Sequence, residues 1–292
     1  MMVWLATAGA AACAGLAGWM AREAFRVRLR REEVALPRLP GPFDGFRVLF
    51  ISDIHRRSVR PLAALLEAQA EKADLVLVGG DLTERGVPEE RVRTNVRLLA
   101  GIAPVFAVFG NHDYDDDAEK LAALLEEEGC TLLRNESRAV ERAGRMILVA
   151  GTDDPSTGRD DVRAALRGPS GRFHPGRRQM FTILLAHDPL IVDRMTAEDM
   201  RMTDLILAGH THGGQIVPPI LGAAVRGHFR YLRGWCKPPG RRKTGGAERP
   251  RLFVSCGYGT SHLPLRLSAP AEAHLFTLRR LRRPRDPEPE TR

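Results

Sequence analysis

The sequence predicts an α/β fold, because short apolar runs alternate with longer stretches of helical periodicity over most of the chain. The chain has 292 residues, of which 43% are hydrophobic and 27% are charged. This length and composition suffice for one large domain or two small ones, and they exclude a disordered or fibrous protein. The runs that we expect to form buried strands are 46–52, 74–80, 104–110, 145–151, 181–187, 204–210, 252–257 and 273–278.

The first expected element is a transmembrane helix over residues 1–21. This stretch has no charged side chain, and it is rich in Ala and Gly, with Trp4 and Trp19 near its ends. Its length is just sufficient to span a bilayer. A cleaved signal peptide is the alternative, but such a peptide has a basic segment before its apolar run, and none precedes this one.

Arginines follow this apolar run directly and predict its orientation. Residues 22–31 contain five of them, and the positive-inside rule places this flank in the cytoplasm. Residues 22–45 are expected to be a basic juxtamembrane segment that ends in a linker, PRLPGPFDG. We therefore expect a single-pass protein of the cell inner membrane, with a folded cytoplasmic domain over residues 46–278.

Within residues 46–278, amphipathic stretches separate several of the expected strands. Residues 61–71, 88–100 and 118–128 carry apolar side chains at helical spacing. Residues 279–292 form a polar tail rich in Arg, Pro and acidic residues, which we expect to stay outside the fold.

The net charge of +8 is concentrated in one segment. Residues 226–251 hold nine basic residues and one acidic residue, so their excess of 9 − 1 = 8 equals that of the whole chain. Because the basic residues are not spread over a fold, nucleic-acid binding is not expected. The segment suits an anionic ligand or a lipid surface, and a solvated loop is the alternative.

The cysteines limit the kinds of metal site that are possible. Cys13, Cys130, Cys236 and Cys256 are far apart and form no CxxC pair, which argues against a disulfide scaffold and a cysteine-based zinc site. A metal ion in this chain would therefore be held by His, Asp and Asn side chains.

Polar residues follow five of the expected strands, at the point where each strand ends. The carboxyl ends of the strands are where an α/β sheet binds ligands, so these segments are expected to converge on one site. If the backbone stays extended, residues two apart point to the same side, which would let such a pair hold one ion together. The five segments are DIH at 53–55, GD at 80–81, GNHD at 110–113, His187, and GHTHGG at 209–214.

These segments supply three oxygen ligands and four imidazoles. Such a set suits a pair of divalent first-row ions and suits Mg²⁺ or Ca²⁺ badly. Mn²⁺ is the expected ion, with Fe²⁺ or Zn²⁺ as alternatives. The expected metal ligands are Asp53, His55, Asp81, Asn111, His187, His210 and His212.

In this order, the five segments resemble the calcineurin-like metallophosphoesterase superfamily, over roughly residues 46–278. The resemblance implies a four-layer αββα sandwich with a dinuclear site. It implies that Asp81 bridges two ions, one held by Asp53, His55 and His212 and the other by Asn111, His187 and His210. The segments GTDDPSTGRDD, GHTHGGQ and GYGTSHLPLR are similar to the membrane-anchored bacterial branch, which includes UDP-2,3-diacylglucosamine pyrophosphatases.

His112 is the candidate catalytic residue, because it adjoins a metal ligand without being expected to be one. It would stabilise the developing charge or protonate the leaving oxygen. The alternative is that it only orients a ligand. Arg56, Arg57 and Glu84 are expected not to touch the ligand set, and the two arginines would grip a substrate phosphate or face solvent. His262 would reach the site or contribute nothing.

The function that follows is hydrolysis of a phosphoester or pyrophosphate bond. The N-terminal helix and the basic segment favour membrane association and an anionic, membrane-associated substrate such as UDP-2,3-diacylglucosamine. A phosphodiesterase or phosphatase acting on soluble nucleotides or phosphoproteins is the alternative. A metal-free binding scaffold has little support, because all seven expected ligands are present.

Overall fold

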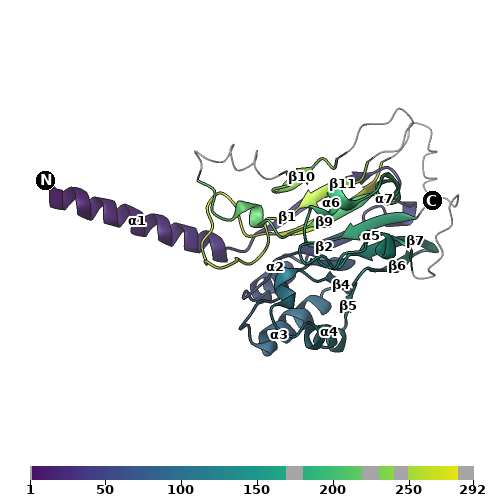
Figure 1. Cartoon of the computed structure of the whole chain (residues 1–292), viewed down its shortest axis with the longest axis horizontal. Helices are drawn as coiled ribbons and strands as arrows, with labels where there is room; N and C mark the ends of the chain where they lie inside the picture. The colour runs from purple at the N-terminus through teal and green to yellow at the C-terminus, as the bar shows by residue number, and fades with distance from the viewer. Residues whose placement is uncertain (1, 169–179, 219–229, 240–248, 282–292) are drawn as a thin grey trace.

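The computed structural model describes residues 2–168, 180–218, 230–239 and 249–281. These residues form two six-stranded sheets that pack face to face, with helices on the outer faces (Figure 1). The mixed α/β class is confirmed, and the two sheets form the sandwich that the sequence resemblance implies.

The first sheet has the order β1-β12-β2-β3-β4-β5. Neighbouring strands from β2 to β5 are parallel, β12 is antiparallel to β2, and β1 is parallel to β12. Three of the expected strands form its parallel centre. The bounds are β1 (Leu29–Leu36), β2 (Arg47–Ile51), β3 (Leu75–Gly79), β4 (Val105–Val108), β5 (Cys130–Leu132) and β12 (Ala273–Arg280).

The second sheet has the order β10-β11-β9-β8-β7-β6. Its four central strands are parallel, and both edge strands are antiparallel to their neighbours. The edge strands are polar or short, which is why the apolar pattern did not reveal them. The bounds are β6 (Glu136–Arg142), β7 (Arg145–Gly151), β8 (Phe181–Leu185), β9 (Leu205–Ala208), β10 (Gly234–Cys236) and β11 (Arg251–Val254).

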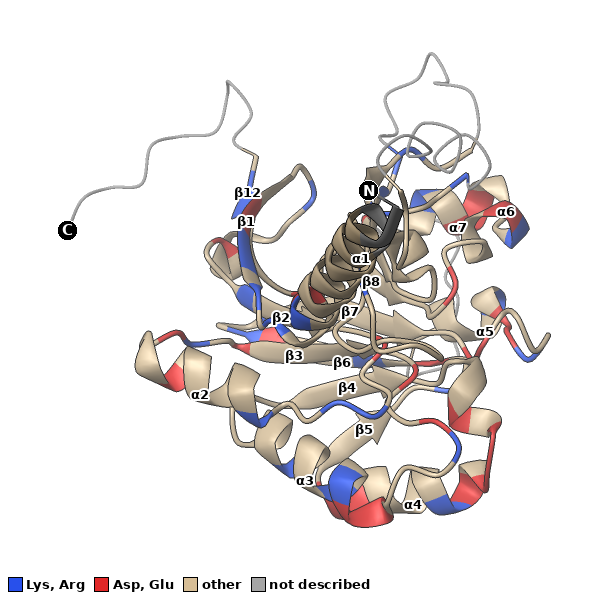
Figure 2. Ribbon diagram, turned by 90° about the vertical axis from the view of Figure 1, so that its left-hand side faces the viewer, with Lys and Arg blue, Asp and Glu red and all other residues tan. Residues whose placement is uncertain are grey.

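Helices cover the outer face of each sheet. Against the first sheet lie α2 (Arg60–Ala68), α3 (Glu89–Ala100) and α4 (Ala118–Glu127), where the sequence predicts helices. The shorter α5 (Val162–Leu166), α6 (Ile191–Arg194) and α7 (Ala197–Met202) cover the second sheet. Basic and acidic side chains are interspersed over α3 and α4 (Figure 2). Single 3₁₀ turns are η1 (Gly41–Phe43), η2 (Asn111–Tyr114) and η3 (His212–Gly214).

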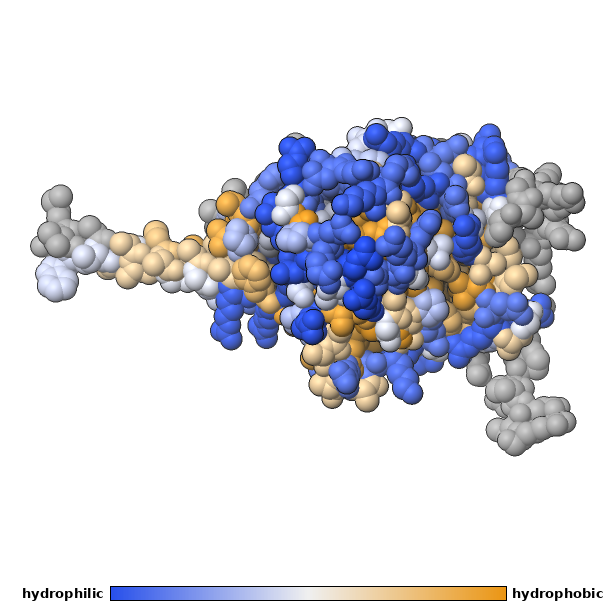
Figure 3. Space-filling view, turned by 90° about the horizontal axis from the view of Figure 1, so that it is seen from below, coloured by the Kyte–Doolittle hydropathy of each residue, from blue (hydrophilic) through white to orange (hydrophobic). Residues whose placement is uncertain are grey.

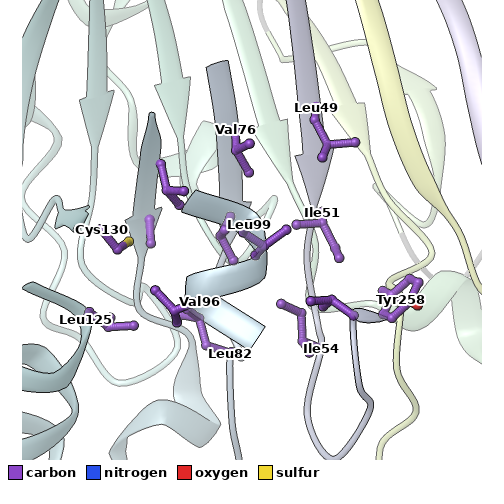
Figure 4. Close-up of a cluster of buried hydrophobic side chains, with 14 of the residues drawn as sticks. Leu49, Ile51, Ile54, Val76, Leu82, Val96, Leu99, Leu125, Cys130 and Tyr258 are labelled. Carbon is purple, nitrogen blue, oxygen red and sulfur yellow. The ribbon is translucent and has the colours of Figure 1, made fainter. Parts of the chain in front are cut away.

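The apolar runs are continuous because each central strand is buried on both faces. On β2, Val48 and Phe50 point to the opposite sheet, whereas Leu49 and Ile51 pack under the outer helices. Figure 4 shows the cluster between the first sheet and its outer helices, in which Val96 and Leu99 of α3 lie over the sheet. Burying one such side chain contributes about 1.5–3 kcal/mol. The clusters on either side of both sheets hold the strand ends, and hence the loops that follow them, in fixed positions.

Residues 29–36 form a strand, although the sequence analysis places them in a juxtamembrane segment and linker. β1 pairs along its whole length with β12, from Leu29 opposite Ala273 to Leu36 opposite Arg280. Half of its residues, in the sequence LRREEVAL, are charged because one strand edge and much of one face are exposed, while Val34 and Leu36 are fully buried. The folded domain therefore begins near Leu29 and not at residue 46.

Helix α1 (Met2–Phe25) contains the apolar N-terminal run and projects from the sandwich (Figure 1). Its projecting part carries mainly apolar side chains (Figure 3). None of the helices in the described part of the chain combines the length and hydropathy needed to span a bilayer. The helix is thus confirmed, and its transmembrane character is not.

The ends of the chain and the basic segment are described only in part. β12 includes Arg279 and Arg280, which were expected to belong to the polar tail, whereas residues 282–292 lie outside the described residues. Within the basic segment 226–251, residues 230–239 and 249–251 are described. There the Arg230 guanidinium lies 3.1 Å from Asp193, and Arg251 stacks over the ring of Trp235.

Candidate metal centre

The two sheets bring their polar loops together at one end of the sandwich. Asp53, Asp81 and Asn111 follow β2, β3 and β4 of the first sheet, whereas His187 and His210 follow β8 and β9 of the second. The loops from one sheet thus face those from the other. All seven residues that the sequence analysis selects as ligands take part in the contacts described below.

One group of side chains surrounds Nε2 of His212. This atom lies 3.0 Å from Nε2 of His55 and 3.5 Å from Oδ1 of Asp53. Nε2 of His55 in turn lies 3.5 Å from Oδ2 of Asp81. Ligands that are each ~2.0–2.2 Å from one shared ion have separations of this size.

A second group surrounds Nδ1 of His210. This atom lies 3.1 Å from Oδ1 of Asn111 and 3.2 Å from Nε2 of His187. Nε2 of His187 lies 3.3 Å from Oδ2 of Asp81. The same carboxylate oxygen therefore belongs to both groups.

The chemistry of these atoms fits divalent cations. Nδ1 of His187 lies 2.8 Å from the carbonyl oxygen of Gly79, so Nδ1 carries the proton and Nε2 offers a lone pair to the site. Oδ2 of Asp53 is buried without any hydrogen-bond partner. Buried carboxylates and imidazoles without donors are stabilised when they bind a metal ion.

The electrostatics of the site keep its central carboxylate ionised. Burial alone would raise the pKa of Asp81, but His187, His55 and the backbone amide of His112 together hold it below its usual range. Nearby, burial and the charge of Asp81 raise the pKa of Asp113 well above its usual range. Asp113 accepts hydrogen bonds from the amides of Gly110 and Thr83, and so it holds the GNHD turn in place.

The backbone at the site is left-handed, and the expectation of an extended backbone at these positions is wrong. Five of the seven expected ligands have positive φ angles, so the chain turns at them instead of continuing as an extended strand. Non-glycine residues in this region cost ~1–3 kcal/mol each. The positive φ angles are 53° at Asp53, 50° at His55, 50° at Asp81, 69° at His210 and 49° at His212.

Two glycines, Gly209 and Gly257, allow the close packing around Asp53. A Cβ on Gly209 would lie 2.5 Å from Oδ2 of Asp53, and a Cβ on Gly257 would lie 2.8 Å from Cβ of the same aspartate. Neither distance is possible for a real side chain, so any larger residue would displace Asp53. Gly209 belongs to the GHTHGG segment, and Gly257 begins the GYGTSHLPLR segment, although the sequence analysis assigned Gly257 no role.

His112 lies at the solvent side of the site. Its backbone amide donates to Oδ1 of Asp81 at 2.9 Å, and its ring centroid lies 5.2 Å from that of His55. Burial lowers the pKa of His112, but the contact of its Nδ1 with Asp115 at 2.8 Å and the charge of Asp81 outweigh burial and raise it. His262, which the sequence left open, reaches this side of the site, with its ring centroid 6.3 Å from that of His112.

Glu84 touches the predicted ligand set, contrary to the sequence analysis. Its Oε2 lies 3.0 Å from Nδ1 of His55, and its other oxygen pairs with Arg56. The contacts with His55 and Arg56 lower the pKa of Glu84 to about 2. A carboxylate at Nδ1 orients the imidazole so that Nε2 faces the site.

The sequence analysis expected Arg57 either to bind a substrate phosphate or to face solvent. In the structure its guanidinium instead contacts backbone carbonyls. Its guanidinium donates to the carbonyl oxygens of Tyr258 at 2.5 Å and Phe25 at 2.6 Å. It also stacks over the Tyr258 ring, 4.0 Å from the centroid. Arg57 therefore joins the loop after β2 to the end of α1.

Arg266 was not found by sequence reasoning. It is fully buried, and burial lowers its pKa to about 10. Its guanidinium donates to backbone carbonyls that include those of Gly259 and Ala269, and its Nη2 lies 3.3 Å from Nδ1 of His212. Because a guanidinium only donates, Nδ1 of neutral His212 is the acceptor in this contact.

Comparisons with known proteins agree with this site. A family model described as calcineurin-like phosphoesterase matches residues 46–214. The chain is 35% identical to the uncharacterized protein YpbG of Bacillus subtilis over 232 residues, which cover 79% of this chain and 80% of YpbG. It is 29% identical to the uncharacterized metallophosphoesterase YkuE of the same organism, covering 82% of each chain.

A third relative has a more specific name. The chain is 32% identical to the phosphodiesterase YaeI of Escherichia coli over 186 residues, which cover 61% of this chain and 64% of YaeI. The match to the family model spans more than half of the chain and contains all seven expected ligands together with the whole GHTHGG segment. The chain therefore belongs to the calcineurin-like phosphoesterase family and is a metallophosphoesterase, a metal-dependent hydrolase of phosphoester bonds.

Proposed function

We propose that the protein is a dinuclear hydrolase of phosphodiester or pyrophosphate bonds, acting on an anionic substrate at a membrane. The observation that carries the dinuclear assignment is the position of Oδ2 of Asp81. It lies 3.5 Å from Nε2 of His55 and 3.3 Å from Nε2 of His187, so one oxygen serves two groups of ligands. In this proposal Mn²⁺ is the preferred ion, with Fe²⁺ or Zn²⁺ as alternatives.

In this proposal the ligands divide into two groups, with Asp81 shared. Asp53, His55 and His212 hold one ion, whereas Asn111, His187 and His210 hold the other. When bound, such a pair of ions supplies positive charge that activates water and polarises a phosphoryl group. Every other contribution to the reaction comes from side chains around the pair.

His112 provides the proton in this proposal. Asp115 holds Nδ1 of His112 at 2.8 Å and raises the pKa of the ring, so His112 retains a proton that it can give to the leaving oxygen. The amide of His112 is fixed on Asp81, which places the ring beside the bridging carboxylate. Its side chain is 23% exposed, as an acid that meets a substrate requires.

Different observations support the proposed bond type and the proposed membrane location. A relative with 32% identity carries the name phosphodiesterase, which favours diesters over monoesters. The exposed apolar surface of α1 and the arginines after it favour a bilayer, with the catalytic domain on the cytoplasmic side of the inner membrane. The sequence resemblance makes UDP-2,3-diacylglucosamine the first substrate to test.

The test uses the full chain in detergent, stripped of metal with a chelator and reloaded with Mn²⁺, Fe²⁺ or Zn²⁺. Hydrolysis rates are compared for UDP-2,3-diacylglucosamine, a simple nitrophenyl phosphodiester, the corresponding monoester and a soluble nucleotide. Two metal equivalents per chain and turnover of the first two substrates would support the proposal. A preference for the monoester would overturn the bond type, and faster turnover of soluble nucleotides than of the lipid would overturn the membrane substrate.

A further inference from the structure

The C-terminal end of α1 is attached to the wall of the metal centre. The backbone amide of Arg266 donates to the carbonyl oxygen of Met20 at 3.1 Å, while the Arg266 side chain contacts His212. Arg57 donates to the carbonyl oxygen of Phe25, and Met20 and Ala24 are buried. The helix therefore leaves the domain next to the site (Figure 1).

Large apolar side chains are exposed around this attachment, and we call them the apolar rim. Three lie on α1, with exposed fractions of 51% for Leu16, 47% for Trp19 and 62% for Phe25. Two lie on loops beside the site, with 37% for Ile216 and 55% for Leu263.

The two loops of the rim are held together and held at the site. Gln215 donates from Nε2 to the carbonyl oxygens of Ser261 and Leu263, and Ile216 forms an isolated bridge with Leu267. Ile216 is only four residues after His212, so its loop continues directly from the metal centre. The rim and the mouth of the site therefore belong to one surface.

The other exposed large apolar side chains of the described residues do not gather in this way. Met146 and Met180 directly precede the paired residues Ile147 and Phe181 of two neighbouring strands, away from the rim. Apart from Trp4 at the far end of α1, the others lie on separate elements, which is normal for a protein surface. These residues are Met146, Met180, Leu190, Trp235 and Leu281.

We propose that the apolar rim docks on an anionic lipid surface, so that the metal centre opens at the depth of the lipid headgroups. Residues 7–19 of α1 are exposed on every side although most are apolar. They do not reach the length and hydropathy needed to cross a bilayer, but they extend the apolar surface that lipid can cover. Trp19 suits the interface between lipid and water. Arg22 and Arg26 are exposed at the base of the helix, where they complement anionic headgroups.

This inference rests on the proposed function and specifies its substrate class. With Ile216 and Leu263 in the interface, a phosphate at headgroup depth reaches the site without its acyl chains leaving the bilayer. The substrate is then an amphiphile with a phosphodiester or pyrophosphate next to its apolar part. A substrate that is fully soluble gains nothing from the rim.

The test compares the full chain with the double variant Ile216→Glu/Leu263→Glu. Leu190→Glu is the matched control, because Leu190 is 49% exposed and lies just before α6, away from the rim. Each protein is placed in vesicles of phosphatidylcholine with phosphatidylglycerol. Turnover of an amphiphilic nitrophenyl diester in the vesicles is divided by turnover of the small soluble diester, which corrects for any change in the site itself.

The expected result is a fall of about tenfold or more in this ratio for the double variant, with no change for Leu190→Glu. Equal ratios for the two variants would overturn the proposal. Hydrogen exchange of residues 214–217 and 261–265 gives a second readout that needs no catalysis. We expect slower exchange in vesicles than in detergent, and no slowing would overturn docking on lipid even if the enzyme is active. Slower exchange without turnover would leave the docking supported and the proposed function overturned.

Discussion

Arg266 connects His212 to the N-terminal helix. Its Nη2 lies 3.3 Å from Nδ1 of His212, and its backbone amide donates to the carbonyl oxygen of Met20 at 3.1 Å. Its remaining donors hold the carbonyls of the loop between β11 and β12. One fully buried side chain therefore fixes an imidazole of the site and the loop beneath α1.

We expect Arg266→Met to lower the free energy of unfolding by about 3–5 kcal/mol, because removing one side chain leaves several buried carbonyls without donors. Urea unfolding of the metal-free protein measures this change. Arg138→Lys is the control, because Arg138 is 47% exposed in a surface ion pair, where substitutions change little. Similar losses for both variants would show that Arg266 is not a structural centre.

Asp81→Asn should lose both ions and activity, since a neutral amide in place of a shared carboxylate leaves two cations without compensating charge. Metal content after gel filtration, measured by elemental analysis, is the readout. Asp115→Asn is the control because Asp115 touches His112 and no expected ligand among the contacts found. Retention of two metal equivalents by Asp81→Asn would contradict the bridging role.

His112→Ala should keep both metal ions and lose activity by about 10²–10⁴-fold, the usual range for a general acid. A diester with a nitrophenyl leaving group needs less help from an acid, so the loss should be smaller for it than for an alkyl diester. If this variant loses metal, or if its activity falls equally for both leaving groups, His112 positions a ligand and is not the general acid.

The pH dependence of stability should contain a contribution from Asp204. Burial raises the pKa of Asp204 to about 6, although the Thr182 amide and Arg38 oppose this. The pKa is higher in the folded protein than in the unfolded chain, so the stabilising contribution is complete below about pH 4 and is lost as the pH rises through 6. A rise from 3.8 to about 6 corresponds to ~3 kcal/mol.

Asp204→Asn should remove this part of the pH dependence, as measured by urea unfolding between pH 4 and pH 7. Asp74→Asn is a matched control. Asp74 accepts a hydrogen bond from the backbone amide of Arg47, just as Asp204 accepts one from that of Thr182. The side chain of Asp74, however, is 38% exposed. An unchanged pH slope in Asp204→Asn would contradict the prediction.

Truncation should show that β1 belongs to the folded domain. A chain starting at Arg26 keeps β1, whereas one starting at Phe43 exposes the edge of β12 and loses the buried Val34, Leu36 and Leu39. At about 1.5–3 kcal/mol for each side chain, we expect a much lower melting temperature and aggregation for the shorter chain only. Equal melting temperatures would mean that β1 is dispensable.

The sequence predicted the parts of the fold that are buried on two faces. β2, β3 and β8 are continuous apolar runs because their alternate residues pack on different layers. β1 was missed because an edge strand can carry charges such as Arg30 and Glu33 on its exposed side. Its pairing partner, β12, lies more than 200 residues away, and no local pattern encodes that contact.

The site was predictable as far as its residues follow strands. The seven expected ligands stand where apolar runs end, so their convergence followed from the sheet. Glu84 and Arg266 act from outside this pattern, one through Nδ1 of His55 and the other through Nδ1 of His212. Their roles depend on three-dimensional contacts, and the left-handed backbone at Asp53 and His55 likewise had no signal such as glycine to reveal it.

Because the expected ligands come from both sheets, bound ions would link the two sheets to each other. Asp53, His55, Asp81 and Asn111 are carried by the first sheet, and His187, His210 and His212 by the second. A change in sheet spacing, for example by a smaller residue at Phe50 or Ile183 in the layer between them, would alter the distance across the site without touching a ligand. We therefore expect the catalytic rate to change with the thickness of the core.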